Sequence, residues 1–179
     1  DSGEWYEPFF RHHPQLLGVE VVNAADRYPT GRDVWDDLQT RLGNDRAVWG
    51  FANDDYHGRK AGYTFDRSRN LLLLDELTEA TVRAAMIEGR FVYQHVMEGE
   101  SRDDPPTIAA IHHDADRGEL RVESPDADEI QWASVGDVVA TGPRLSYRDT
   151  PGVGAYVRAR VVSAAGSETG TQPFLLEQE

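Results

Sequence analysis

The segment Val48-Trp49-Gly50-Phe51-Ala52-Asn53-Asp54-Asp55-Tyr56-His57 joins an apolar run to a polar end. The apolar residues 47–52 predict a buried strand, which delivers two carboxylates and an imidazole at its carboxyl end. Side chains two residues apart on an extended backbone point the same way, so Asp55 and His57 can reach one point in space. Such a pair suits a divalent metal ion, but a solvated polar loop produces the same short pattern.

The residues around this segment alternate between expected strands and helices. After a short amphipathic helix at residues 5–13, the order is strand 16–23, helix 30–43, strand 47–52, strand 71–74, helix 78–89 and strand 91–96. This order is typical of an α/β layer with parallel strands, in which the carboxyl ends of the strands share one rim. We therefore expect Asn23 and residues 55–57 on that rim. Glu20 is unusual, because a carboxylate inside an apolar strand is costly unless it is paired or reaches a site.

The second half of the chain has a different pattern. Charged residues and a Pro105-Pro106 pair indicate a boundary near residues 98–106, which divides the chain into residues 1–99 and 100–179. Beyond the boundary, short strand patterns without intervening helices predict a small antiparallel β-sandwich. The expected strands are 107–114, 119–123, 130–135, 138–141, 154–162 and 172–176.

The composition limits the classes of partner. The 179 residues include 32 acidic and 18 basic side chains, which give a net charge of −14. Such a field repels nucleic acid backbones and anionic lipid surfaces, so we expect neither as a partner. The chain has no cysteine, which excludes disulfides, thiolate metal sites and cysteine nucleophiles. No apolar run is long enough for a membrane span and no secretory signal is visible, so we expect a cytoplasmic protein.

Several motifs, taken in order, resemble the later part of the PHP (polymerase and histidinol phosphatase) domain family of metal-dependent phosphoesterases. The motifs are residues 17–23, 26–29, 48–57, 69–74 and 89–93. Residues 130–132, 156–159 and 171–174 resemble the β-rich extension that some members carry. The resemblance implies the C-terminal part of a distorted (β/α)7 barrel, over residues 1–99, followed by the β-sandwich of residues 100–179.

The resemblance also implies a site and a reaction. The final metal motif of the family, Asp-x-His, matches Asp55 and His57, which would bind divalent Mn, Fe or Zn. Glu20, Asn23 and Asp54 would border the metals or face the substrate, a small phosphorylated molecule hydrolysed by metal-activated water. The His-x-His motif with which family members begin is absent from this sequence. The expected partner is therefore a missing N-terminal portion of the same protein, without which the chain would be inactive.

A second hypothesis, from another class of protein, stays open. Under this hypothesis the chain is a non-catalytic remnant or binding module, whose β-sandwich docks a partner or a glycan. Residues 1–99 would then act only as a scaffold.

Overall fold

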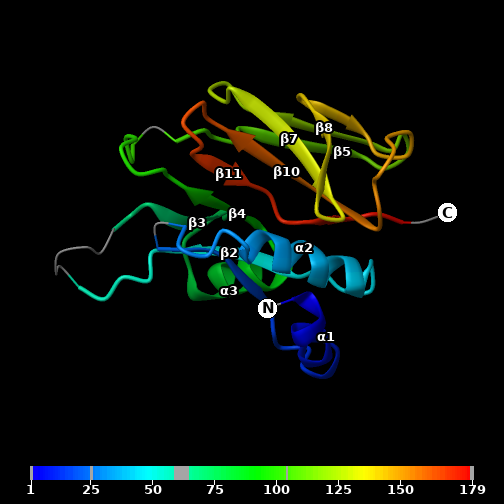
Figure 1. Ribbon diagram of the computed structural model, residues 1–179, viewed down its shortest axis with the longest axis horizontal. Helices are drawn as coiled ribbons and strands as arrows, with labels where there is room; N and C mark the ends of the chain where they lie inside the picture. The colour runs from blue at the N-terminus through cyan, green and yellow to red at the C-terminus, as the bar shows by residue number, and fades with distance from the viewer. Residues whose placement is uncertain (1, 25, 59–64, 104, 178–179) are drawn as a thin grey trace.

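The computed structural model describes residues 2–24, 26–58, 65–103 and 105–177, and these form three helices and twelve strands (Figure 1). The helices are α1 (Gly3–His12), α2 (Gly31–Leu42) and α3 (Glu79–Glu88). The strands of the first half are β1 (Gly18–Asn23), β2 (Trp49–Asn53), β3 (Ser68–Leu72) and β4 (Phe91–His95). Those of the second half are β5 (Ala110–Asp114), β6 (Glu119–Glu123), β7 (Glu129–Ser134), β8 (Asp137–Thr141), β9 (Arg144–Ser146), β10 (Tyr156–Val162), β11 (Glu168–Gly170) and β12 (Phe174–Leu175).

Most of these strands belong to two antiparallel sheets. The larger has the order β3-β4-β11-β10-β7-β8, with β12 also paired to β10, and the smaller has the order β5-β6-β9. Apolar side chains from both sheets share one core, because alternate residues of each strand point to the same face. The buried members of this core are Leu120, Val122, Trp132, Leu145, Val157, Ala159, Val161 and Leu176.

A second core joins the helices α1 and α2 to the parallel pair β1-β2. Trp35 of α2 is its largest member, and the indole N–H donates to the Val48 carbonyl at 2.7 Å. A Cβ at Gly50 would come within 2.8 Å of the Trp35 ring, so only glycine leaves room for the ring against β2. The other buried members are Phe10, Val21, Val22, Leu38, Leu42, Val48, Ala52 and Tyr93.

The predicted barrel is wrong. Among the described residues only β1 and β2 run parallel, and the sheets they and the other strands form are not closed. β3 and β4 are antiparallel although α3 lies between them in the sequence. A crossover helix must bury one face against its sheet, whereas α3 buries only Ala85 and leaves Ile87 53% exposed. The periodic pattern of residues 78–89 therefore predicted a helix correctly, but not a helix that carries the chain back to a parallel strand.

The larger sheet crosses the predicted boundary between residues 99 and 100. β4 pairs with β11 through the register Glu168↔His95 and Gly170↔Tyr93, so strands from both halves of the chain are neighbours. The division of the chain into residues 1–99 and 100–179 stays a prediction. The two halves meet through the pairing of β4 with β11 in this sheet. In the part of the chain that is described, no helix is long and apolar enough to cross a membrane.

Candidate functional site

Six residues at the carboxyl ends of β1 and β2 form what we call the strand-end group. They are Glu20, Asn23, Asn53, Asp54, Asp55 and His57. β1 and β2 end in register, with Asn23 beside Asn53. The Glu20 carboxylate accepts a hydrogen bond from the side-chain amide of each asparagine, at 3.0 Å from Asn23 and 2.8 Å from Asn53. The unusual carboxylate in β1 is therefore paired, and it joins the two strand ends.

Asp55 and His57 lie next to each other just beyond this junction. His57 Nε2 is 2.8 Å from Asp55 Oδ1, and both side chains reach solvent. Asp55 has a φ of 50°, a left-handed conformation that aspartate tolerates better than most residues. Two ligands of one divalent ion, each about 2.1 Å from it, lie roughly 3 Å apart. The separation of Asp55 and His57 is thus close to the one that a shared ion requires.

Asp54 has a different set of contacts. Its carboxylate accepts hydrogen bonds from the backbone N–H groups of Arg67 at 3.1 Å and Ser68 at 2.8 Å, and also from that of Asp66. These bonds hold the start of β3 against the end of β2. The structure therefore gives Asp54 a positioning role at the edge of the strand-end group.

The strand-end group contains one pair of side chains suited to a metal ion rather than a complete set of ligands. Within the described ranges, no three histidine, aspartate or glutamate side chains gather closely enough to hold a metal ion. Glu20 is committed to the two asparagine amides, and the carboxylate of Asp54 to backbone N–H groups. Asp55 and His57 fit the role of two ligands in a site completed by other groups.

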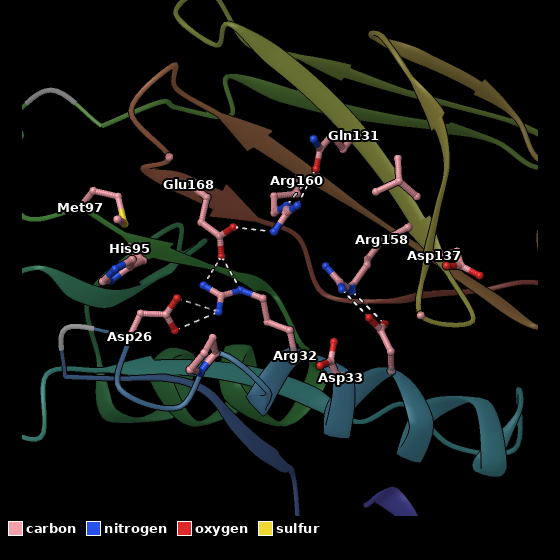
Figure 2. Close-up of a pocket in the computed structure, with 16 residues that line it drawn as sticks. Asp26, Arg32, Asp33, His95, Met97, Gln131, Asp137, Arg158, Arg160 and Glu168 are labelled. Carbon is pink, nitrogen blue, oxygen red and sulfur yellow. Dashed lines mark hydrogen bonds and ion pairs between the residues drawn. The ribbon is translucent and has the colours of Figure 1, made fainter.

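A pocket of about 390 Å3 lies between α2 and the strands β7, β10 and β11 (Figure 2). It was not predicted from the sequence. We call it the arginine pocket, after the side chains of Arg32, Arg158 and Arg160 that line it. Acidic side chains come from the same elements, notably Asp36 of α2 and Glu168 of β11. The pocket therefore lies where the helix layer meets the larger sheet.

Arg32 and Arg160 share one carboxylate. Arg32 Nε donates to Glu168 Oε1 at 2.9 Å, while Arg160 Nη1 donates to Glu168 Oε2 at 3.0 Å. Asp26 accepts a further hydrogen bond from Arg32 Nη1 at 2.9 Å. Burial alone would lower the pKa of Arg32, but the charges of Glu168 and Asp26 outweigh it and raise the pKa above its ordinary value. The Arg32 guanidinium is thus charged, and hydrogen bonds to Glu168 hold both guanidinium groups in place.

Arg158 forms a separate buried pair with Asp36. Its Nε and Nη2 donate to the two carboxylate oxygens at 3.0 and 2.5 Å, and the Tyr156 hydroxyl donates to the same carboxylate at 2.8 Å. The Arg158 guanidinium also lies 4.8 Å from the centre of the Trp35 ring. Burial opposes its charge, but the hydrogen bond to Asp36 outweighs it and raises the pKa of Arg158. This pair connects β10 to α2.

His95 lines the pocket as a neutral side chain. The Ser68 hydroxyl donates its single proton to the Ala24 carbonyl at 3.1 Å, so its oxygen accepts from His95 Nδ1 at 2.9 Å. The proton of the neutral ring is therefore on Nδ1. Burial lowers the pKa of His95 below its ordinary value, and this outweighs the opposing charges of Asp26 and Glu168.

One signal for the arginine pocket was present in the sequence. Arg158 and Arg160 are two residues apart in an otherwise apolar strand, so both guanidinium groups lie on one face of the sheet. A pair of charges inside such a strand requires partners. The partners, Asp36 and Glu168, could not be chosen from the 32 acidic residues without the fold.

No known protein family, curated protein or solved structure matches this chain.

Proposed function

We propose that this chain supplies Asp55 and His57 to the divalent-metal site of a phosphoester hydrolase. The observation that carries the proposal is the 2.8 Å approach of Asp55 Oδ1 and His57 Nε2 beside the joined ends of β1 and β2. The ordered motifs that resemble metal-dependent phosphoesterases support it as well. The proposal requires no barrel. It requires only that two parallel strand ends present an oxygen and a nitrogen ligand at one edge.

Each residue of the strand-end group has a definite task in this proposal. Asp55 binds as a carboxylate and His57 as a neutral imidazole, a combination that suits Mn, Fe or Zn. Glu20 holds the Asn23 and Asn53 side chains together, and Asn53 precedes the ligand segment directly. When bound, a divalent ion supplies an activated water and neutralises charge on the phosphoryl oxygens.

The remaining ligands would come from polypeptide outside the described residues. An apolar groove of about 590 Å3 between α1, α2 and β1 supports a docking place for it. Trp5 and Tyr28 line this groove and are 62% and 58% exposed. In the described part of the chain, β1 has β2 as its one neighbouring strand. An apolar groove beside an open strand edge is typical of a surface that receives another polypeptide segment.

The proposal also includes a substrate class and a cellular location. The substrate is a small phosphorylated molecule, and the cysteine-free, strongly acidic sequence is compatible with a cytoplasmic location.

The test measures phosphate ester hydrolysis by the intact protein. We expect Mn2+-dependent hydrolysis of p-nitrophenyl phosphate, and we expect Asp55→Asn and His57→Ala each to lower kcat/KM by about a hundredfold or more. Glu79→Gln, on the exposed surface of α3, is the control and should leave the rate unchanged. Full activity in both ligand variants would remove Asp55 and His57 from the site. Absence of metal-dependent hydrolysis by the unaltered protein would contradict the function itself.

A further inference from the structure

The outer edge of β2, which faces away from β1, is closed by side chains. In the part of the chain that is described, β2 pairs with β1 alone. The Trp49 N–H and the Asn53 carbonyl are hydrogen-bonded on the β1 side. Consecutive residues of a strand direct their backbone groups to opposite sides, so the N–H and C=O groups of Gly50 and Ala52 point to the outer edge.

Each of these two residues is bound by one side-chain amide. Asn70 of β3 accepts a hydrogen bond from the Ala52 N–H at 3.0 Å and donates one to the Ala52 carbonyl at 2.8 Å. Gln172, which follows β11, accepts from the Gly50 N–H at 2.8 Å and donates to the Gly50 carbonyl at 3.1 Å. An amide side chain has both a donor and an acceptor, so each one satisfies a residue of β2 as a neighbouring strand would.

We propose that Asn70 is a positioning residue for the metal ligands Asp55 and His57. The role rests on the proposed function, because it concerns the same ligand pair, and it assigns a task to a residue outside the strand-end group. Ala52, which Asn70 binds, lies three residues before Asp55 in the sequence. A change in the position of Ala52 therefore moves the start of the segment that carries both ligands.

Asn70 is itself held by the larger sheet. β3 pairs with β4, and Asn70 lies opposite Tyr93, whose side chain is fully buried. Asp54 makes a second connection between β2 and β3, because its carboxylate accepts from backbone N–H groups at the start of β3. The end of β2 is thus bound to β3 on both sides of Asn53, and the ligand segment leaves β2 from a fixed position.

Loss of the Asn70 amide would leave two buried backbone groups without a partner. Ala52 is 1% exposed, so solvent has little access to its N–H and C=O groups. An unpaired buried backbone group is costly, which favours a shift of β2 toward other partners. Removing a group that supports metal ligands without binding the metal typically lowers metal affinity by about 10- to 100-fold. The expected consequence is a weaker ion site in a protein that still folds.

Gln172 provides a matched comparison for Asn70. It makes the same pair of hydrogen bonds and is 6% exposed, but its partner Gly50 lies five residues before Asp55. At about 3.3 Å per residue, Gly50 is roughly 16 Å from the ligands along an extended chain. Effects at such separations are largely independent. Loss of the Gln172 amide should therefore lower stability without a comparable effect on ion binding.

The test measures Zn2+ affinity at His57 and stability in the same variants. Zn2+ is titrated into the chain while the His57 ring signals are followed by NMR, and urea denaturation gives the stability. Asn70→Leu and Gln172→Met remove an amide at nearly constant size, and both should lower the urea midpoint. We expect Asn70→Leu to weaken Zn2+ binding by about tenfold or more, and Gln172→Met to change it by less than about twofold.

Asn44→Leu, at an exposed position after α2, is the control and should leave Zn2+ binding unchanged. If Asn70→Leu does not fold, Asn70→Ala is measured in its place against the same expectations. Equal Zn2+ affinity in the Asn70 variant and the unaltered protein would overturn the positioning role, and so would equal weakening in the Asn70 and Gln172 variants. Either result leaves the proposed function standing. His57 signals that do not respond to Zn2+ in the unaltered protein would contradict the proposed function and the positioning role together.

Discussion

The strand-end group and the arginine pocket are built in opposite ways. The pair Asp55 and His57 is local in sequence, reaches solvent, and its two side chains contact each other. The pocket joins residues as far apart as Arg32 and Glu168, which are 136 positions apart, and its ion pairs are largely buried. An exposed pair contributes little to stability and is available to a ligand, whereas a buried network is required by the fold. We therefore expect substitutions in the arginine pocket to lower the stability of the fold. Substitutions in the strand-end group should leave stability nearly unchanged.

The largest effect on stability is expected at Asp36. Asp36→Ala leaves the Arg158 charge buried without its carboxylate and removes an acceptor from Tyr156, so the free energy of unfolding should fall by about 3–5 kcal/mol. Urea denaturation measures the change. The control is Asp33→Ala, an exposed residue in the first turn of the same helix, which should cost less than about 1 kcal/mol. Equal losses in the two variants would show that the Asp36 pair is not required by the fold.

A smaller loss is expected at Glu168. Glu168→Gln keeps the shape and one acceptor oxygen but removes the charge between Arg32 and Arg160, so we expect a loss of about 1.5–3 kcal/mol in urea. Glu119→Gln, which removes the half-buried partner of the exposed Arg144, should lie within about 0.5 kcal/mol of the unaltered protein. A Glu168 variant as stable as the Glu119 variant would contradict the shared-carboxylate arrangement.

His95 should make stability depend on pH. Its pKa is lower in the folded protein, because burial disfavours the charged ring, than the ordinary value of 6.5 that applies in the unfolded chain. The unfolded chain therefore binds more protons below pH 6.5, and stability should be full above that pH and fall as the pH is lowered toward the folded pKa. Urea midpoints between pH 5 and pH 8 measure the slope. His95→Gln should flatten it, whereas His112→Gln, at an exposed position, should leave it as it is.

The smallest effect on stability is expected at Asp55. Asp55→Asn keeps a residue that tolerates the left-handed backbone and removes only a half-exposed charge, so stability should stay within about 0.5 kcal/mol. Thermal unfolding checks this expectation. A large loss would mean that the Asp55–His57 contact is a structural element, which would remove the contrast between the two regions.

The sequence predicted the elements better than their arrangement. Gly43 and Gly89 were correct as helix ends, and the apolar run before Asn53 is β2. Parallel pairing was wrong beyond β1 and β2, because whether a helix crosses a sheet depends on which face it buries, and α3 buries little. β11 was not predicted, since its three residues are polar or glycine and are buried by their neighbours.

In the candidate site, too, contacts within one segment could be predicted from the sequence, whereas contacts between distant segments could not. Asp55 and His57 could be found because two residues of one segment carry the whole pattern. The Glu20 contact to Asn53 depended on the parallel register, which the predicted strands indicated in general but not residue by residue. The arginine pocket depended on pairing between α2 and strands far along the chain, and no local pattern contains that information.

The proposed function requires that Asp55 and His57 hold a divalent ion. The most direct test adds substoichiometric Mn2+ to the chain and records which backbone amide signals it broadens in NMR spectra. We predict that broadening begins at residues 54–58 and disappears from them in Asp55→Asn, while Glu79→Gln behaves as the unaltered protein. Broadening that begins elsewhere on this acidic surface, or that is the same in Asp55→Asn, would contradict the claim.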